Sequence, residues 1–218
     1  MDEPGLAAGD FSSWMGQMQG ALGGERGSDV PCQGCTACCT SSQFIHIGPD
    51  EVDTLARIPA DLLFPAPRLP FGHVLLGYDH RGHCPMLIDN RCSIYQHRPR
   101  TCRTYDCRVL PAAGLQGDSD KPLIAQQARR WRFSFPTLAA RVEHDAVAAA
   151  ATYLDQHSDL LSDASVPTGA TPIAVLAVQV HRVFLGYDQA SEQHIVVDPE
   201  PEVVRTEILH VIGAIDAD

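Results

Sequence analysis

Apolar residues recur along this chain in short runs, and the spacing within each run predicts a strand or a helix. Between residues 131 and 135 three aromatic residues alternate with polar ones, which is typical of a half-buried strand. From 172 to 185 apolar residues instead return every three or four positions, with Thr171 as a cap and Gly186 as the stop. The same patterns predict strands at 44–47, 73–78 and 194–197 and further helices at 50–57, 138–161 and 202–212.

Residues that favour turns separate these runs. The longest loops expected from proline and glycine are 58–70 and 111–122. Two short apolar stretches flank Asp89-Asn90-Arg91, which predicts a tight hairpin that would bring Cys84 and Cys92 close together. Further on, Pro99 suits the first turn of a short helix that carries Cys102.

The first 29 residues combine many glycines with few structural signals, and we expect a flexible tail there. A docking helix is the alternative, since five apolar residues recur at helical spacing: Phe11, Trp14, Met15, Met18 and Leu22. Glycines in the same stretch lower the stability of such a helix, so the tail is the favoured interpretation.

Length and charge narrow the class of protein. A chain of 218 residues can bury an ordinary hydrophobic core, as one domain or as a small domain with appendages. The formal net charge of −11 argues against a nucleic-acid partner, because such binding rests on neutralising phosphates. No apolar run approaches the roughly 20 residues that cross a bilayer, and the start of the chain does not resemble a secretion signal. We therefore expect a cytoplasmic protein with no nucleic-acid and no membrane partner.

All eight cysteines fall between residues 32 and 107, a density that core packing does not explain. Four of them form the run Cys32-x-x-Cys35-x-x-Cys38-Cys39, and the others follow at irregular spacing: Cys84, Cys92, Cys102 and Cys107. Thiolates bind zinc and iron strongly, and two-residue spacers let neighbouring sulfurs converge, so soft-metal coordination is the favoured chemistry. Eight thiols suffice for two four-sulfur sites or for one centre with spare thiols, and the spacing does not name the metal.

Other cysteine chemistries account for fewer of these residues. A disulfide framework suits an oxidising compartment better than the cytosol. A catalytic cysteine or a thiol–disulfide exchanger needs one or two thiols and leaves the others unused. Histidine nitrogens can complete a metal site, although an ordinary surface role is the favoured interpretation for the four histidines among the cysteines: His73, His80, His83 and His97.

Three strings in this region resemble those of a known family. They are Cys32-Gln-Gly-Cys35-Thr-Ala-Cys38-Cys39, Gly82-His-Cys84-Pro85-Met-Leu and Cys92-Ser-Ile94-Tyr95-Gln-His-Arg98-Pro99-Arg-Thr-Cys102-Arg103. Their order, and the strand and helix expected between them, resemble the YkgJ-like cysteine-cluster proteins, whose CxxCxxCC domain is described as chelating zinc or iron. The resemblance covers about residues 30–110, and Cys107 is its weakest position.

The resemblance implies a metal centre, which would be an iron–sulfur cluster or iron, with zinc as the alternative. All eight cysteines are then candidate ligands. Arg98 and Arg103 lie in the third string and are candidates for supporting the bound cofactor, because guanidinium groups stabilise thiolates and donate hydrogen bonds to sulfur. Six arginines accompany only two aspartates between residues 81 and 108, which favours an anionic centre there, although a role as solvated surface stays open for these arginines.

These observations together predict an α+β protein in which helix exceeds strand. The expected parts are a tail at 1–29, a small irregular cysteine-rich metal-binding module of short strands and helices at 30–110, a linker or loop at 111–122 and an α-rich C-terminal region at 123–218.

The expected function is metal binding in a redox, sensing or metal-handling role, with a protein partner as a further expectation. The competing class is a zinc-stapled structural or interaction module without a redox role. An activity like that of the flagellin lysine methylase, a relative with such a cysteine signature, is less favoured. The reason is that no glycine-rich loop follows a strand to hold a methyl-donor nucleotide. No catalytic residue is identified.

Overall fold

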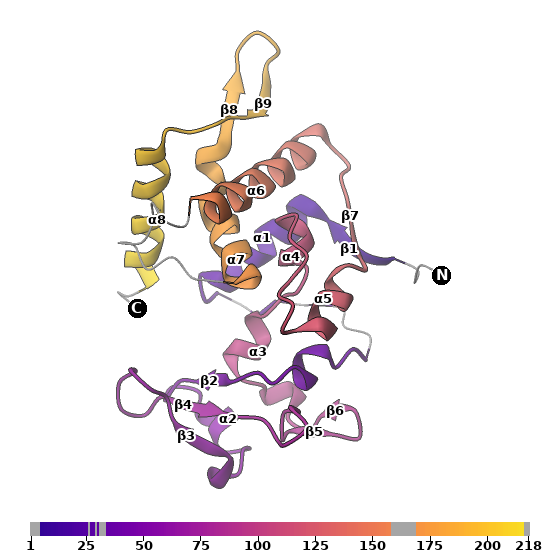
Figure 1. The fold of residues 1–218 in the computed structure, drawn as a ribbon, viewed down its shortest axis with the longest axis vertical. Helices are drawn as coiled ribbons and strands as arrows, with labels where there is room; N and C mark the ends of the chain where they lie inside the picture. Colours follow the sequence, from indigo (N-terminus) through magenta and orange to yellow (C-terminus); the bar gives the residue numbers. More distant parts are fainter. Residues whose placement is uncertain (1–4, 26, 29, 31–33, 158–168, 216–218) are drawn as a thin grey trace. The chain divides into compact units, whose positions relative to one another are not determined.

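The structure is a computed structural model, and it describes residues 5–25, 27, 28, 30, 34–157 and 169–215 (Figure 1). Helices exceed strands, and the strands within these ranges form several small separate sheets, so the expected α+β class is confirmed. The chain divides into two units. Unit 1 comprises Met1–Gln19, Cys107–Asp120 and Ala125–Asp218, and unit 2 comprises Gly20–Asp106 and Lys121–Ile124.

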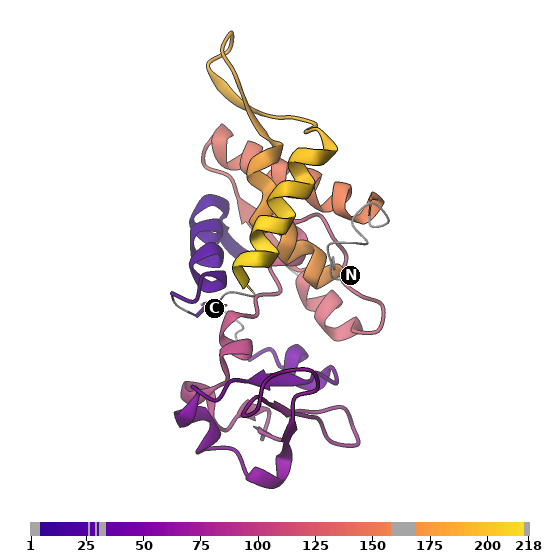
Figure 2. The same ribbon diagram turned by 90° about the vertical axis from the view of Figure 1, so that its left-hand side faces the viewer.

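Unit 1 is mainly helical. Its elements are β1 (Leu6–Asp10), most of α1 (Phe11–Leu22), α4 (Val109–Ala112), most of α5 (Pro122–Ala128), β7 (Trp131–Ser134), α6 (Leu138–Gln156), α7 (Ala170–Val180), η5 (His181–Phe184), β8 (Leu185–Asp188), β9 (Gln193–Val196) and α8 (Pro201–Ile215). Alanine lines the buried faces of α6 and α7, which lets these two helices pack closely. Figure 2 shows α8 running beside α7, with which it is in contact.

The flexible tail expected at 1–29 is not what the structure shows for residues 6–22, which form β1 and α1. β1 pairs with β7 in parallel, and α1 buries its apolar residues, with Phe11, Trp14, Met15 and Met18 each at most 2% exposed. The Phe11 ring lies 5.2 Å from that of Phe133 on β7. Burial of these large side chains outweighs the cost of glycine within the helix.

Unit 2 consists of short elements joined by loops. They are η1 (Ala37–Thr40), β2 (Ile45–Ile47), α2 (Val52–Leu55), η2 (Ala60–Leu62), β3 (Leu63–Pro65), β4 (Val74–Leu76), β5 (Leu87–Ile88), β6 (Arg91–Cys92), η3 (Tyr95–His97) and α3 (Arg100–Thr104). β4 lies between β2 and β3 in an antiparallel sheet, and β5 pairs with β6. A small apolar core joins the two: Ile47, Ile58, Leu76, Met86 and Ile94.

Several predicted elements are confirmed, and two further predictions are corrected besides that of the tail. The strands expected near 44–47, 73–78, 131–135 and 194–197 are present as β2, β4, β7 and β9. β3 lies inside the expected loop at 58–70, because its Pro65 occupies an edge strand, where a missing N–H is tolerated. The helix expected at 172–185 is present as α7, which begins at Ala170 after Gly169, so Thr171 lies within the helix and does not cap it. Leu185, the last residue predicted for this helix, belongs to β8.

The long helix expected at 138–161 is present as α6, and positions 158–161 lie outside the described residues. None of the helices in the described ranges has both the length and the apolar character needed to cross a membrane.

Candidate metal centre

The predicted hairpin positions two of the cysteines. Leu87 on β5 pairs with Cys92 on β6, and the two residues between the strands, Asp89 and Asn90, have φ of 49° and 57°. Two consecutive positive φ values define the type of turn that joins tightly paired strands, and Asn and Asp tolerate them well. Cys84 precedes the hairpin, and both Cys84 and Cys92 pack against the apolar core of unit 2.

A backbone contact joins the first cysteine run to the segment of Cys84. The Cys84 N–H donates to the Cys39 carbonyl at 2.7 Å, and the Ser42 N–H donates to the Gly82 carbonyl at 2.9 Å. Gly82 has φ of 78°, which favours glycine, and a Cβ there would lie 2.3 Å from the Ser42 Oγ, so the serine hydroxyl would have to turn away.

The turn before Cys84 is stabilised by one carboxylate. Asp79 accepts hydrogen bonds from the backbone N–H of His83 at 2.9 Å and of Arg81 at 2.8 Å, and from the Arg81 guanidinium. These donors, the His83 N–H foremost, lower the pKa of Asp79 to about 2. The carboxylate therefore stays ionised and holds the turn throughout the neutral range.

Cys102 lies on α3, the short helix predicted after Pro99. Its N–H donates to the Pro99 carbonyl at 2.9 Å. The neighbouring Thr101 hydroxyl donates to the carbonyl of His46 on β2 at 2.8 Å, which ties α3 to the sheet.

Four thiols from these separate segments influence one another. Burial, the largest cause, and the nearby sulfurs of Cys39, Cys84 and Cys92 together raise the pKa of the Cys102 thiol to about 12. Burial, together with Cys92, also raises the pKa of Cys84. Such interactions require the four sulfurs to lie in one neighbourhood. Ionised sulfurs at such separations repel one another, and a bound proton or cation removes that repulsion.

The four thiols are near one another but are not arranged as a finished coordination site. Among the residues described, no three side chains of His, Cys, Asp or Glu stand together in a geometry that would hold a metal ion. Both findings are compatible, because electrostatic influence extends over several ångströms whereas sulfur–metal bonds measure about 2.3 Å. A metal would therefore draw the thiols together.

Arg98 is a cation whose charge acts on this thiol group. Its charge lowers the pKa of Cys102, and its guanidinium lies 3.9 Å from the centre of the Tyr95 ring. Its Nε is buried and has no hydrogen-bond partner within the described part of the chain. Arg103, the other arginine singled out from the sequence, lies 3.8 Å from the Glu51 carboxylate.

The other four candidate cysteines belong to the first cysteine run or to unit 1. Cys35 is half-buried and its sulfur accepts from the Ala37 N–H at 3.5 Å, while Cys38 precedes Cys39 on η1. Cys32 lies outside the described residues. Cys107 belongs to unit 1, is 7% exposed and accepts the indole N–H of Trp131 at 3.2 Å.

Two polar groups near the site were not singled out by sequence reasoning as functional. Glu51 lies at the start of the helix expected at 50–57, and its side chain is buried. His46 lies on a predicted strand, and its Nε2 lies 2.9 Å from Nδ1 of His73, one of the four histidines among the cysteines. Neither residue belongs to a recognisable spacing, so no signal in the sequence would have found them.

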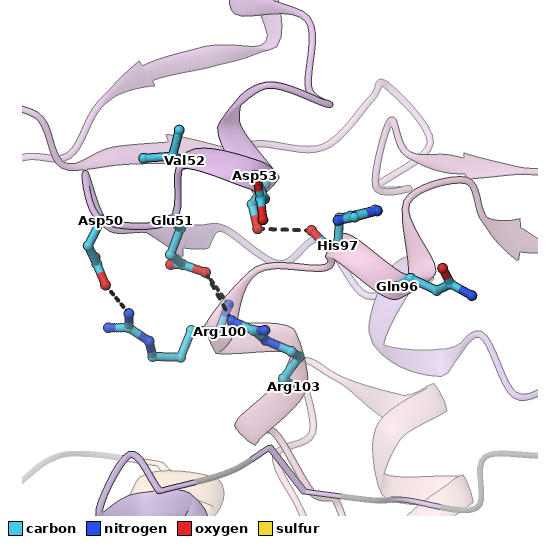
Figure 3. Close-up of a pocket in the computed structure, with 9 residues that line it drawn as sticks. Asp50, Glu51, Val52, Asp53, Gln96, His97, Arg100 and Arg103 are labelled. Carbon is cyan, nitrogen blue, oxygen red and sulfur yellow. Dashed lines mark hydrogen bonds and ion pairs between the residues drawn. The ribbon is translucent and has the colours of Figure 1, made fainter.

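A pocket of about 320 Å³ opens beside α2 and α3 (Figure 3). Its lining consists mainly of charged and polar residues: Asp50, Glu51, Val52, Asp53, Thr54, Gln96, His97, Arg100 and Arg103. The figure shows the Arg100 guanidinium beside the Asp50 carboxylate and Glu51 turned toward α3. None of the seven cysteines that the structure describes lines this pocket.

Comparison with known proteins identifies the cysteine region. Residues 31–122 match the model of the CxxCxxCC family, described as a "putative zinc- or iron-chelating domain". This match confirms the resemblance seen in the sequence, and it covers less than half of the chain. No curated protein and no solved structure matches the chain.

Proposed function

We propose that the CxxCxxCC domain of this protein binds metal through the thiolates of Cys39, Cys84, Cys92 and Cys102. The bound species would be an iron–sulfur cluster or iron, in a redox, sensing or metal-handling role. The single observation that carries this proposal is that four separate segments of unit 2 bring their cysteines together. The Cys84 N–H donates to the Cys39 carbonyl, Cys84 and Cys92 pack on one apolar core, and Cys102 lies within electrostatic reach of the other three. The family description, zinc- or iron-chelating, supports metal binding in general.

The donor set suits a soft metal. Four thiolates around a zinc ion, or around an oxidised four-iron cluster, leave a formal charge of about −2. A half-buried site needs a neighbouring cation and hydrogen-bond donors to offset that charge. Arg98 meets both needs, because its charge already favours the Cys102 thiolate and its buried Nε is available to donate to sulfur.

The other predicted residues receive different proposed roles. Cys32, Cys35 and Cys38 precede Cys39 within eight residues and are the proposed ligands of any second ion or of a rearranged centre. Cys107 is proposed to be a core thiol of unit 1, on the basis of its burial and its bond from Trp131. Arg103 is proposed to form an ion pair with the Glu51 carboxylate.

A zinc-stapled interaction module is the second candidate, and one surface favours it. The rings of Phe44, Phe64 and Tyr78 form an exposed cluster in unit 2, with Phe44 lying 4.9 Å from Tyr78 and 5.9 Å from Phe64. Contiguous exposed aromatic side chains are typical of surfaces that contact another protein. In this function the metal would only hold the module together.

Purification without air, followed by elemental analysis, distinguishes the two candidates. Iron together with acid-labile sulfide supports the cluster, iron alone supports a mononuclear iron site, and stoichiometric zinc in a colourless protein supports the staple. A protein that retains none of these metals, and takes up none when supplied with them anaerobically, contradicts both.

A further inference from the structure

A buried carboxylate holds the helix that carries Cys102. Glu51 lies at the start of α2, and its side chain is only 4% exposed. Charged side chains are almost never buried to this extent unless they are paired. The partners of Glu51 therefore show what its burial achieves.

Those partners come from two different parts of unit 2. Glu51 Oε1 accepts the backbone N–H of Gly48 at 3.0 Å, and Oε2 accepts the backbone N–H of Arg100 at 2.5 Å. The Arg103 guanidinium approaches Oε2 at 3.8 Å. Figure 3 shows the Glu51 carboxylate reaching toward Arg100 and Arg103. One side chain thus joins the turn after β2 to the first and last turns of α3.

α3 needs such a contact because its own sequence provides none. The residue before it is Pro99, which makes no side-chain capping bond, and the first N–H groups of a helix have no partner within the helix. Serine, threonine, aspartate or asparagine usually meets this need from the adjacent position. Here the acceptor is Glu51, which lies 49 residues away in the sequence.

Cys102 follows Arg100 by two residues, so the placement of Arg100 determines where the Cys102 sulfur lies. On the proposed function, we infer that Glu51 is a positioning residue, whose carboxylate fixes α3 so that Cys102 joins Cys39, Cys84 and Cys92 around one metal. Outer partners of this kind commonly alter metal affinity ten- to a hundredfold when they are removed.

Cobalt provides the test, because Co²⁺ occupies tetrahedral zinc sites and its visible absorption depends on how many sulfur atoms bind it. The full-length protein is stripped of metal, loaded anaerobically with Co²⁺ and titrated. For wild type we expect the spectrum of four thiolates. For Glu51→Gln we expect loss of one thiolate from that spectrum and affinity lower by roughly ten- to a hundredfold, because an amide cannot accept from both N–H groups.

Asp50→Asn is the matched control. Asp50 is the adjacent acid, is exposed, and bonds the side chain of Arg100 instead of its backbone. We expect this variant to keep the wild-type cobalt spectrum. Glu51→Asp is the second variant if Glu51→Gln does not fold. Its shorter carboxylate keeps the charge but reaches only one of the two N–H groups, so we expect a smaller loss of cobalt–thiolate absorption and of affinity.

The outcomes separate the inference from the proposed function. A Glu51 variant that is less heat-stable but has an unchanged cobalt spectrum and affinity contradicts the positioning role, because a merely structural residue would behave in that way. A wild-type protein without thiolate-to-cobalt absorption contradicts the proposed function itself.

Discussion

At the scale of single residues, the geometry of the candidate site depends on one glycine. Gly82 allows the turn before Cys84 to pass against Ser42, which keeps the first cysteine run beside Cys84. Gly82→Ala would introduce both an unfavourable positive φ and a steric clash, at a cost of about 1–3 kcal/mol. We expect weaker metal binding in a competition titration. Gly16→Ala is the control, because nothing lies within 4 Å of a Cβ at that helical position, and metal binding equal in both variants would contradict this account.

Replacement of Cys102 and of Cys107 should have different effects on metal content. Cys102→Ser removes a proposed ligand and should lower the metal content. Cys107→Ser should retain full metal and lose about 1 kcal/mol of stability, because a buried hydroxyl costs more to remove from water than a buried thiol. Metal analysis and urea unfolding of both variants check this. A Cys102→Ser protein with full metal loading would refute the ligand assignment.

A buried histidine predicts how the stability of unit 1 varies with pH. Burial lowers the pKa of His181 below its ordinary value, and its Nδ1–H donates to the Val178 carbonyl at 2.7 Å. The unfolded chain therefore takes up a proton at a pH where the folded protein does not, so stability falls as pH decreases through about 6.5. In His181→Asn the amide keeps a donor but does not titrate, and its unfolding free energy should fall less between pH 7.5 and 5.5. Equal losses in variant and wild type would contradict the prediction.

At the scale of elements, α1 offers the clearest difference between expectation and structure. Trp14 is 2% exposed, and its ring lies 5.0 Å from that of Phe133. Trp14→Ala should therefore destabilise unit 1 by about 3–5 kcal/mol, as expected for a large core side chain. Thermal unfolding measures the change. A variant as stable as wild type would restore the interpretation of this segment as a loose tail.

Elements set by local chemistry could be predicted, whereas those set by distant pairing could not. The hairpin at Asp89 and Asn90 follows from residues that tolerate positive φ, and the strand β7 follows from alternation within five residues. β1 becomes a strand only because it pairs with β7 more than 120 residues later. In the same way, the role of Glu51 depends on Arg100, and no local pattern joins the two.

At the scale of the whole molecule, the net charge is unevenly divided. Unit 2 contains nine acidic and nine basic residues, so the whole surplus of −11 belongs to unit 1. A metal–thiolate centre of the proposed kind in unit 2 would therefore face no excess of negative charge within its own unit, and the arginines of that unit would offset the sulfur charge.

Metal removal should affect the two units differently. A ligand that binds only the folded state stabilises it by about 4 kcal/mol at a thousand times its dissociation constant. We expect chelation to speed amide hydrogen exchange in unit 2, which contains the four thiols, and to leave α6 and α7 of unit 1 protected. Equal protection of unit 2 with and without metal would show that the thiols do not hold the domain through a bound ion.

X-ray absorption at the edge of the bound metal, recorded on anaerobically purified protein, tests the central claim most directly. The account predicts a first shell of four sulfur atoms at about 2.3 Å. In Cys102→Ser one sulfur is lost, from the shell of a single bound ion or from the shell of one iron in a cluster. A shell made only of nitrogen and oxygen atoms, or one that is unchanged in Cys102→Ser, would contradict it.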